Sequence, residues 1–225
     1  MKRLFCSQIS NGVEKILERE LNILRDRLLL MGGEAELALQ RATHALSQRN
    51  SGVASRVLEH DCVIDCLELE IDRLSIEALT MHQPVAGDLR MVISILKITP
   101  VLERIADHAS SIARIAIELN DEPELKTYDE LNEMATRALE MLQSALDAFT
   151  LSDADKARRL IIKDKEVDKI YERLITQLLK TMAQDAAKSN RLARLIFVAK
   201  NLERIGDYVK DICKLTIYMK EAVLI

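Results

Sequence analysis

Apolar residues recur along this chain at the spacing of amphipathic helices. In the fifth helical stretch, they stand three, four or seven residues apart, at Leu160, Val167, Ile170, Leu174 and Leu178. Side chains at these intervals lie on one face of an α-helix. The pattern therefore predicts a helix with a single apolar stripe, which packing against other helices would bury.

Breaks in this periodicity divide the chain into six helical stretches. The predicted helices cover residues 13–48, 53–82, 88–119, 124–150, about 153–182 and 189–219. We expect Asp88 to cap the third helix, and Ser152 or Asp153 to cap the fifth. Helices of this length exceed the usual dozen residues and are typical of elongated bundles. The predicted fold class is all-α.

The composition supports helices and narrows the class of protein. Among 225 residues there are only six glycines and three prolines, and 3% of residues are aromatic. Acidic and basic residues are interspersed, with a net charge of −4, whereas nucleic-acid binders favour a basic face. The most apolar segment, residues 91–102, is interrupted by Lys97 and Pro100 and is shorter than the roughly 20 residues of a membrane span. We expect a cytoplasmic protein that does not bind nucleic acid.

In the reducing cytoplasm, we expect the four cysteines to be free thiols. Cys62 and Cys66 stand four residues apart on a predicted helix, and we expect both to be buried in the core.

A short motif occurs twice in the chain. Residues 101–108 read Val-Leu-Glu-Arg-Ile-Ala-Asp-His, and residues 201–208 read Asn-Leu-Glu-Arg-Ile-Gly-Asp-Tyr. An Asp-x-x-x-Asp pair precedes each copy, on the helix before it. The second and third helices therefore correspond to the fifth and sixth. We predict an internal duplication of a three-helix unit, with a first unit at residues 1–121 and a second at 122–225.

The duplicated motifs place acidic residues in pairs. Asp61 and Asp65 are one helical turn apart, as are Glu103 and Asp107, so each pair shares a face. Two such faces in contact would gather four carboxylates, which repel unless protons, arginines or a cation neutralise them. Oxygen ligands suit hard cations such as Mg, Ca and Mn, and also Fe. The alternative is a solvated face on which Arg104 pairs with the acids.

Catalytic signatures are missing from the sequence. None of the four histidines belongs to the Glu-x-x-His motif of di-iron bundles. The chain also lacks a Gly-rich phosphate loop, His-Glu-x-x-His and Gly-x-Ser-x-Gly. We therefore predict a protein that is not an enzyme. A carboxylate-bridged metalloenzyme and a metal-free helical scaffold remain as alternatives.

Taken together, these motifs resemble the PhoU family. The resemblance rests on Glu-Arg-Ile-Gly-Asp at 203–207, the Asp-x-x-x-Asp pairs, the segment 83–90 and the duplication, and it extends from about residue 14 to 219. It implies two pseudo-symmetric antiparallel three-helix bundles, and metal ions such as Mg, Mn, Fe or Zn on the acidic faces. Carried over by position, the implied metal ligands are Asp61, Asp65, Glu103 and Asp107, and Asp164, Asp168, Glu203 and Asp207.

The resemblance also implies a role. Members of the family regulate bacterial phosphate uptake by contact rather than catalysis. This chain would repress the phosphate-starvation response and modulate uptake by linking the ATPase subunit of a phosphate ABC transporter to a sensor histidine kinase. It would act in the cytoplasm as a homodimer and would reach the membrane only through these partners.

The two copies are not identical. Pro100 and His108 in the first copy stand where the second has Lys200 and Tyr208. We therefore expect the two implied metal sites to differ in occupancy.

Overall fold

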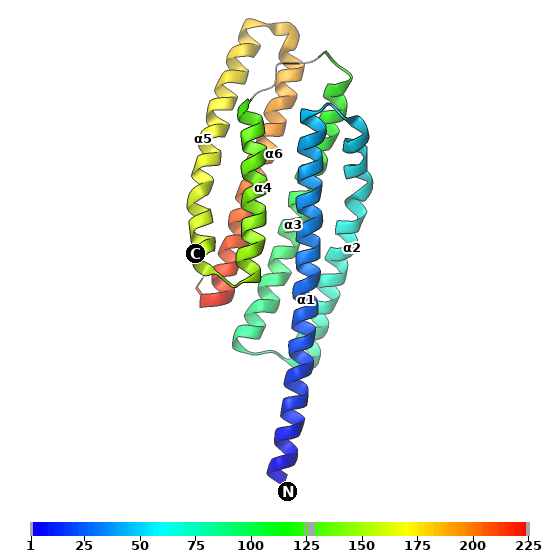
Figure 1. Cartoon of the computed structure of the whole chain (residues 1–225), viewed down its shortest axis with the longest axis vertical. Coiled ribbons are helices and arrows are strands. Elements are labelled where there is room, and N and C mark those ends of the chain that lie inside the picture. Colours follow the sequence, from blue (N-terminus) through cyan, green and yellow to red (C-terminus); the bar gives the residue numbers. More distant parts are fainter. Residues whose placement is uncertain (1, 124, 126–128, 224–225) are drawn as a thin grey trace.

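The computed structural model describes residues 2–123, 125 and 129–223. These residues form helices throughout, and no strand occurs among them. The helices are α1 (Lys2–Ser47), α2 (Ser51–His82), α3 (Ala86–Asn120), α4 (Asp129–Thr150), α5 (Ala154–Gln184), the short 3-10 helix η1 (Ala186–Lys188) and α6 (Ser189–Glu221). Consecutive α-helices run antiparallel along one long axis, as Figure 1 shows. The all-α prediction is confirmed.

Four helices form the inside of the bundle. α3 packs against α1 and α6, and α4 packs against α6 and α1, so these four helices close a ring. The outer helix α2 contacts α1 and α3, whereas α5 contacts α6 and α4. Figure 1 accordingly places α5 and α2 at opposite edges of the molecule. The second helix of each unit is thus its outer helix, as the repeat requires.

The core runs through all six α-helices without a break. The apolar stripe predicted for residues 160–178 is buried along its whole length. Burial of each leucine side chain in such a stripe contributes about 2 kcal/mol. Because one core serves both units, the boundary at residue 121 stays a prediction. None of the described helices combines the length and apolarity that a bilayer crossing needs.

The turns between the first two helices of each unit repeat as well. Arg49 and Ser152 occupy matching positions and have φ angles of 51° and 50°. This left-handed conformation ends a helix in the way that glycine often does. The next residues, Asn50 and Asp153, each accept a backbone N–H bond three residues on, at 3.1 and 2.8 Å. The predicted cap at Asp153 is confirmed.

Other local expectations are wrong. α3 begins at Ala86, so Asp88 lies inside the first turn and is not the cap. Its N–H already bonds to the carbonyl of Val85, which shows that helical geometry starts before it. Cys62 and Cys66 are exposed rather than buried. They fall on the side of α2 that the core does not cover.

Candidate functional site

Six of the acidic residues on α2 and α3 form or border the candidate site of the first unit. Two of them, on α2, were not among the predicted ligands. The α2 residues are Asp61, Asp65, Glu68 and Asp72, and the α3 residues are Glu103 and Asp107.

Glu103 shows how strongly these groups interact. Partial burial, together with the negative charges of Asp107 and Glu68, raises the pKa of Glu103 to about 7. A side-chain hydrogen bond with Asp107 and the charge of Asp65 act in the same direction. Carboxylates this close favour a proton or a cation between them. The first unit therefore carries a cluster of acidic side chains whose charges raise the pKa of Glu103.

Glu68 belongs to the same cluster. Burial raises its pKa, and the charges of Asp72 and Asp65 add to the rise, whereas Arg104 opposes it. Asp107 also raises the pKa of Glu68. The sequence offered a signal for this residue, because Glu68 follows Asp65 by three positions and shares its helix face.

Asp61 has a different partner. Its Oδ1 accepts a hydrogen bond from Ser110 Oγ at 3.1 Å, and Ser110 is almost fully buried. The charges of Asp65 and Asp107 act on both Glu103 and Glu68, so the structure brings Asp65, Glu103 and Asp107 together. Asp61 faces α3 at Ser110, and its predicted role as a metal ligand stays a prediction.

On the matching face of the second unit, a lysine side chain lies between the carboxylates. The ammonium of Lys210 lies 2.5 Å from Asp164 Oδ2 and 2.8 Å from Asp207 Oδ1. Asp164 is only 3% exposed, and burial raises its pKa while Lys210 lowers it. Burial lowers the pKa of Lys210, but its bonds to the two carboxylates outweigh this and leave the pKa above its usual value. Lys210 therefore carries its charge between the two aspartates.

The remaining predicted ligands of the second unit are also near basic groups. Glu203 Oε2 pairs with Lys200 Nζ at 2.6 Å, and Arg204 reaches Asp207 at 3.8 Å. Asp168 is close enough for its charge to raise the pKa of Asp164. Neither lysine was predicted to pair with these carboxylates. Each stands three residues from an acidic motif residue, which is the spacing of a helical ion pair.

The differences between the two units fall at matching positions. Pro100 and Ser110 of α3 correspond to Lys200 and Lys210 of α6, one hundred residues later. Both first-unit residues are uncharged, whereas both second-unit residues are cations. The helix α6 therefore carries two charges on its acidic face that α3 does not have.

The outer helices α2 and α5 also differ in charge, and here the first unit carries the additional charged residue. Glu68 of α2 corresponds to Tyr171 of α5, in the same register in which Asp65 matches Asp168. Lys200 Nζ lies 5.6 Å from the centre of the Tyr171 ring, a favourable cation–π distance. The first unit thus has an additional acid where the second has a ring that accommodates a lysine.

His108 takes part in packing rather than in the acidic cluster. Its Nδ1 lies 2.6 Å from Asn201 Oδ1, which links α3 to α6. The amide nitrogen of Asn201 donates to the carbonyl of Phe197, so the amide oxygen accepts a hydrogen bond from the Nδ1–H of His108. The rings of His108 and Tyr208 are 5.6 Å apart across the same contact.

The two faces differ in their suitability for metal. Among the described residues, no three His, Cys, Asp or Glu side chains are arranged as a finished metal site. The first unit nevertheless offers a cluster of carboxylates, the donor set that hard cations take, with the charge of Arg104 acting on Glu68. The second unit does not fit a metal in the same way, because Lys210 bridges the carboxylates that would bind it.

Sequence comparisons identify relatives along almost the whole chain. The model of the PhoU domain family matches residues 28–116 and 131–216. A "Phosphate-specific transport system accessory protein PhoU homolog" of Clostridium acetobutylicum is 36% identical over 91% of this chain and 94% of its own. The "Phosphate-specific transport system accessory protein PhoU" of Escherichia coli K12 is 35% identical over 88% of this chain and 83% of its own.

Solved structures agree with these matches. The crystal structure of PhoU from Pseudomonas aeruginosa has a TM-score of 0.89 at 39% identity, covering 92% of this chain and 99% of that one. The phosphate transport system regulatory protein PhoU from Streptococcus pneumoniae gives 0.87 at 27% identity, covering 93% and 99%.

Proposed function

Because the chain belongs to the PhoU family, we propose that it is an accessory regulator of phosphate transport. The observation that carries this proposal is the double match to the family, which covers most of both three-helix units. Relatives that align over most of their length are named as accessory proteins of a phosphate-specific transport system.

In this role the chain acts by contact and not by catalysis. It would bind the ATPase subunit of a phosphate ABC transporter and the cytoplasmic part of a sensor histidine kinase, and so repress the phosphate-starvation response. Both contacts place it in the cytoplasm, and a homodimer would present each contact surface twice. The names of the relatives as accessory and regulatory proteins support a role without catalysis.

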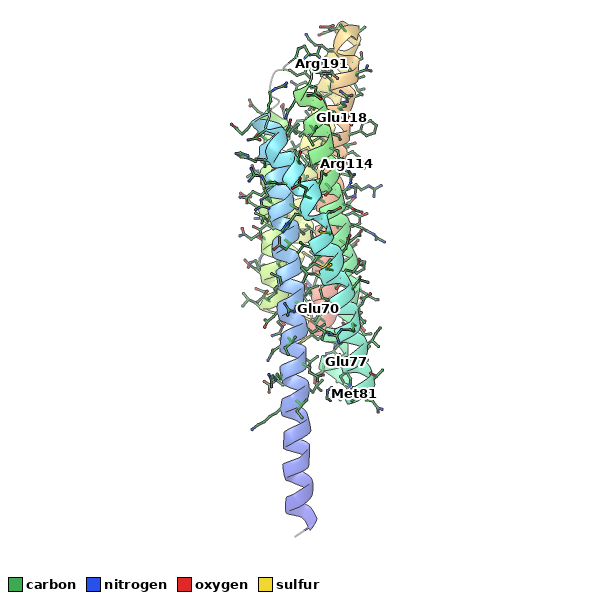
Figure 2. The ribbon with its side chains drawn as sticks, turned by 90° about the vertical axis from the view of Figure 1, so that its right-hand side faces the viewer. Glu70, Glu77, Met81, Arg114, Glu118 and Arg191 are labelled. Carbon is green, nitrogen blue, oxygen red and sulfur yellow. The ribbon has the colours of Figure 1, made fainter. Side chains whose placement is uncertain are left out.

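The outer helix of the first unit offers a surface for such contacts. Leu69 and Ile76 are 71% and 59% exposed and stand seven residues apart, so they lie on one side of α2. Glu70, Glu77 and Met81 follow one another along this helix in Figure 2, and Met81 is 74% exposed. Neighbouring exposed apolar side chains with a charged rim are a feature of protein interfaces.

We further propose that the acidic cluster of the first unit binds metal. Asp65, Glu68, Glu103 and Asp107 would supply the ligands, and Mg, Mn, Fe or Zn are the candidate ions. The raised pKa of Glu103 supports this proposal, because part of the rise comes from the negative charges of Asp107, Glu68 and Asp65 around it. A bound cation would neutralise the cluster and hold α2 and α3 together.

A pull-down with the two partners tests the proposed role. We expect the purified chain to retain the transporter ATPase and the cytoplasmic kinase fragment, and deletion of the gene to release the starvation response at high phosphate. A Leu69→Glu, Ile76→Glu variant should weaken retention of a partner, while the control Ile162→Glu, an exposed residue on α5, should not. Binding of neither partner, with intact repression in the deletion strain, would rule the role out.

A further inference from the structure

We propose that Lys210 is the resident cation of the second unit and closes its acidic face to metal, so that the chain takes up metal on the α2–α3 face only. This inference rests on the metal binding proposed for the first unit. The inference states which of the duplicated acidic motifs can still bind a metal ion.

The position of Lys210 is the first step. Its ammonium contacts one carboxylate from α5 and one from α6, Asp164 at 2.5 Å and Asp207 at 2.8 Å. A metal shared by the two motifs would have to contact the same two side chains. An ammonium and a metal ion cannot occupy this space together, because both are positive and both need these oxygens.

The burial of the pair makes the ammonium hard to displace. The Asp164 side chain is 4% exposed and that of Lys210 is 24% exposed. A metal would have to expel the lysine, which would then lose two charge-assisted bonds. Gly206 makes room for this arrangement, since a Cβ atom there would lie 2.8 Å from Asp164 Oδ1.

In the first unit, the residue that matches Lys210 carries no charge, and this leaves the acidic face available to a metal ion. Ser110 takes the place of Lys210, and it donates a hydrogen bond to Asp61, the counterpart of Asp164. A hydroxyl satisfies the aspartate without adding charge. The neighbouring Asp65, Glu103 and Asp107 are then left unbalanced, whereas Lys200 adds a second cation beside Glu203 in the other unit.

Exchange of the two matching residues tests the inference. Mn²⁺ is titrated calorimetrically into chelator-treated full-length protein. We expect Mn²⁺ binding by the wild type, none by Glu103→Gln, Asp107→Asn, and recovered binding when Lys210→Ser is added to that double variant. The melting temperature of the triple variant should rise with Mn²⁺, while that of the double variant should not change. Lys214→Ser, which removes an exposed lysine of the same helix, is the matched control and should restore nothing.

The outcomes separate the two proposals. Absence of Mn²⁺ binding by the wild type would count against the metal role of the first unit. Mn²⁺ retained by the double variant with Lys210 in place, or not regained after Lys210→Ser, would overturn the inference about Lys210. Ser110→Lys in the wild type provides the reverse exchange and should abolish binding. If that variant does not fold, the Lys210→Ser arm still decides the question.

Discussion

The ammonium of Lys210 and the buried carboxylate of Asp164 form an ion pair of 2.5 Å across the α5–α6 contact. In the first unit, the matching Ser110 and Asp61 are joined by a neutral hydrogen bond of 3.1 Å. One duplicated helix pair thus contains its own cation, and the other contains an unbalanced acidic cluster. The two units share a fold but differ in electrostatics.

Removing the charge of Lys210 should destabilise the protein. A Lys210→Met change keeps most of the volume but leaves Asp164 buried beside Asp207 without a counter-charge. Breaking a buried ion pair from one side costs about 3 kcal/mol. We expect this loss in urea unfolding of metal-free protein. The control Lys214→Met, whose pair with Asp211 is exposed, should cost less than about 1 kcal/mol.

Two glycine positions should respond oppositely to alanine. At Gly206 the added Cβ would lie 2.8 Å from the held carboxylate of Asp164, so we expect a loss of about 1–3 kcal/mol. At Gly33 no atom lies within 4 Å of the added Cβ, and the better helix propensity of alanine should add about 0.5–1 kcal/mol. Thermal unfolding of both variants measures the contrast. Equal effects at the two sites would show that Gly206 is not constrained by Asp164.

Arg49 should stabilise the end of α3. Its Nη2 lies 3.2 Å from the carbonyl of Leu119, 2.9 Å from that of Asn120 and 2.7 Å from that of Glu122. Leu119 and Asn120 are the last residues of α3, and Glu122 lies just beyond it, at the helix end that a cation stabilises. We expect Arg49→Met to reduce the free energy of unfolding by about 1.5–3 kcal/mol.

The matched control for this prediction is Arg56→Met. Arg56 is exposed, and its one hydrogen bond to a described residue goes to the carbonyl of Gly52, within its own helix. It should leave stability within about 0.5 kcal/mol of the wild type. Similar losses of unfolding free energy in both variants would mean that the contact of Arg49 with the end of α3 does not stabilise the protein.

Glu103 gives the metal-free protein a pH dependence. The pKa of this carboxyl rises from 4.5 to about 7 in the folded state, so the folded chain holds this proton more tightly than the unfolded chain. The resulting stabilisation is complete below about pH 4.5 and is lost as the pH rises through about 7. Melting temperatures in chelator should therefore fall over this interval by more in the wild type than in Glu103→Gln. Glu59→Gln, at an exposed site on α2, controls for the loss of one acidic residue.

Much of the fold could be read from the sequence because it depends on periodicity. The stripe at residues 160–178 and the cap at Asp153 follow from rules that act within one or two helical turns. The start of α3 did not follow, because the extended Val85 is the cap and its carbonyl already accepts the N–H of Asp88. The exposed cysteines were missed for a related reason: composition favours burial, but the position on the helix decides it.

The acidic site was only partly predictable. Helical spacing placed Glu103 beside Asp107 correctly, and the repeat located the matching residues in the second unit. Whether each acidic face is neutralised could not be predicted, because this depends on whether a basic side chain elsewhere on the same face reaches the carboxylates. Lys210 reaches two of them, and the only sequence sign of this was a lysine three residues after Asp207.

A comparison of metal uptake between the two units tests the central claim most directly. Glu103→Gln, Asp107→Asn and Glu203→Gln, Asp207→Asn remove the same groups from the first and second unit. After loading with Mn²⁺ and removal of free metal, elemental analysis should find metal lost from the first variant and unchanged in the second. Metal lost equally from both variants, or lost only from the second, would contradict the assignment of the site to α2 and α3.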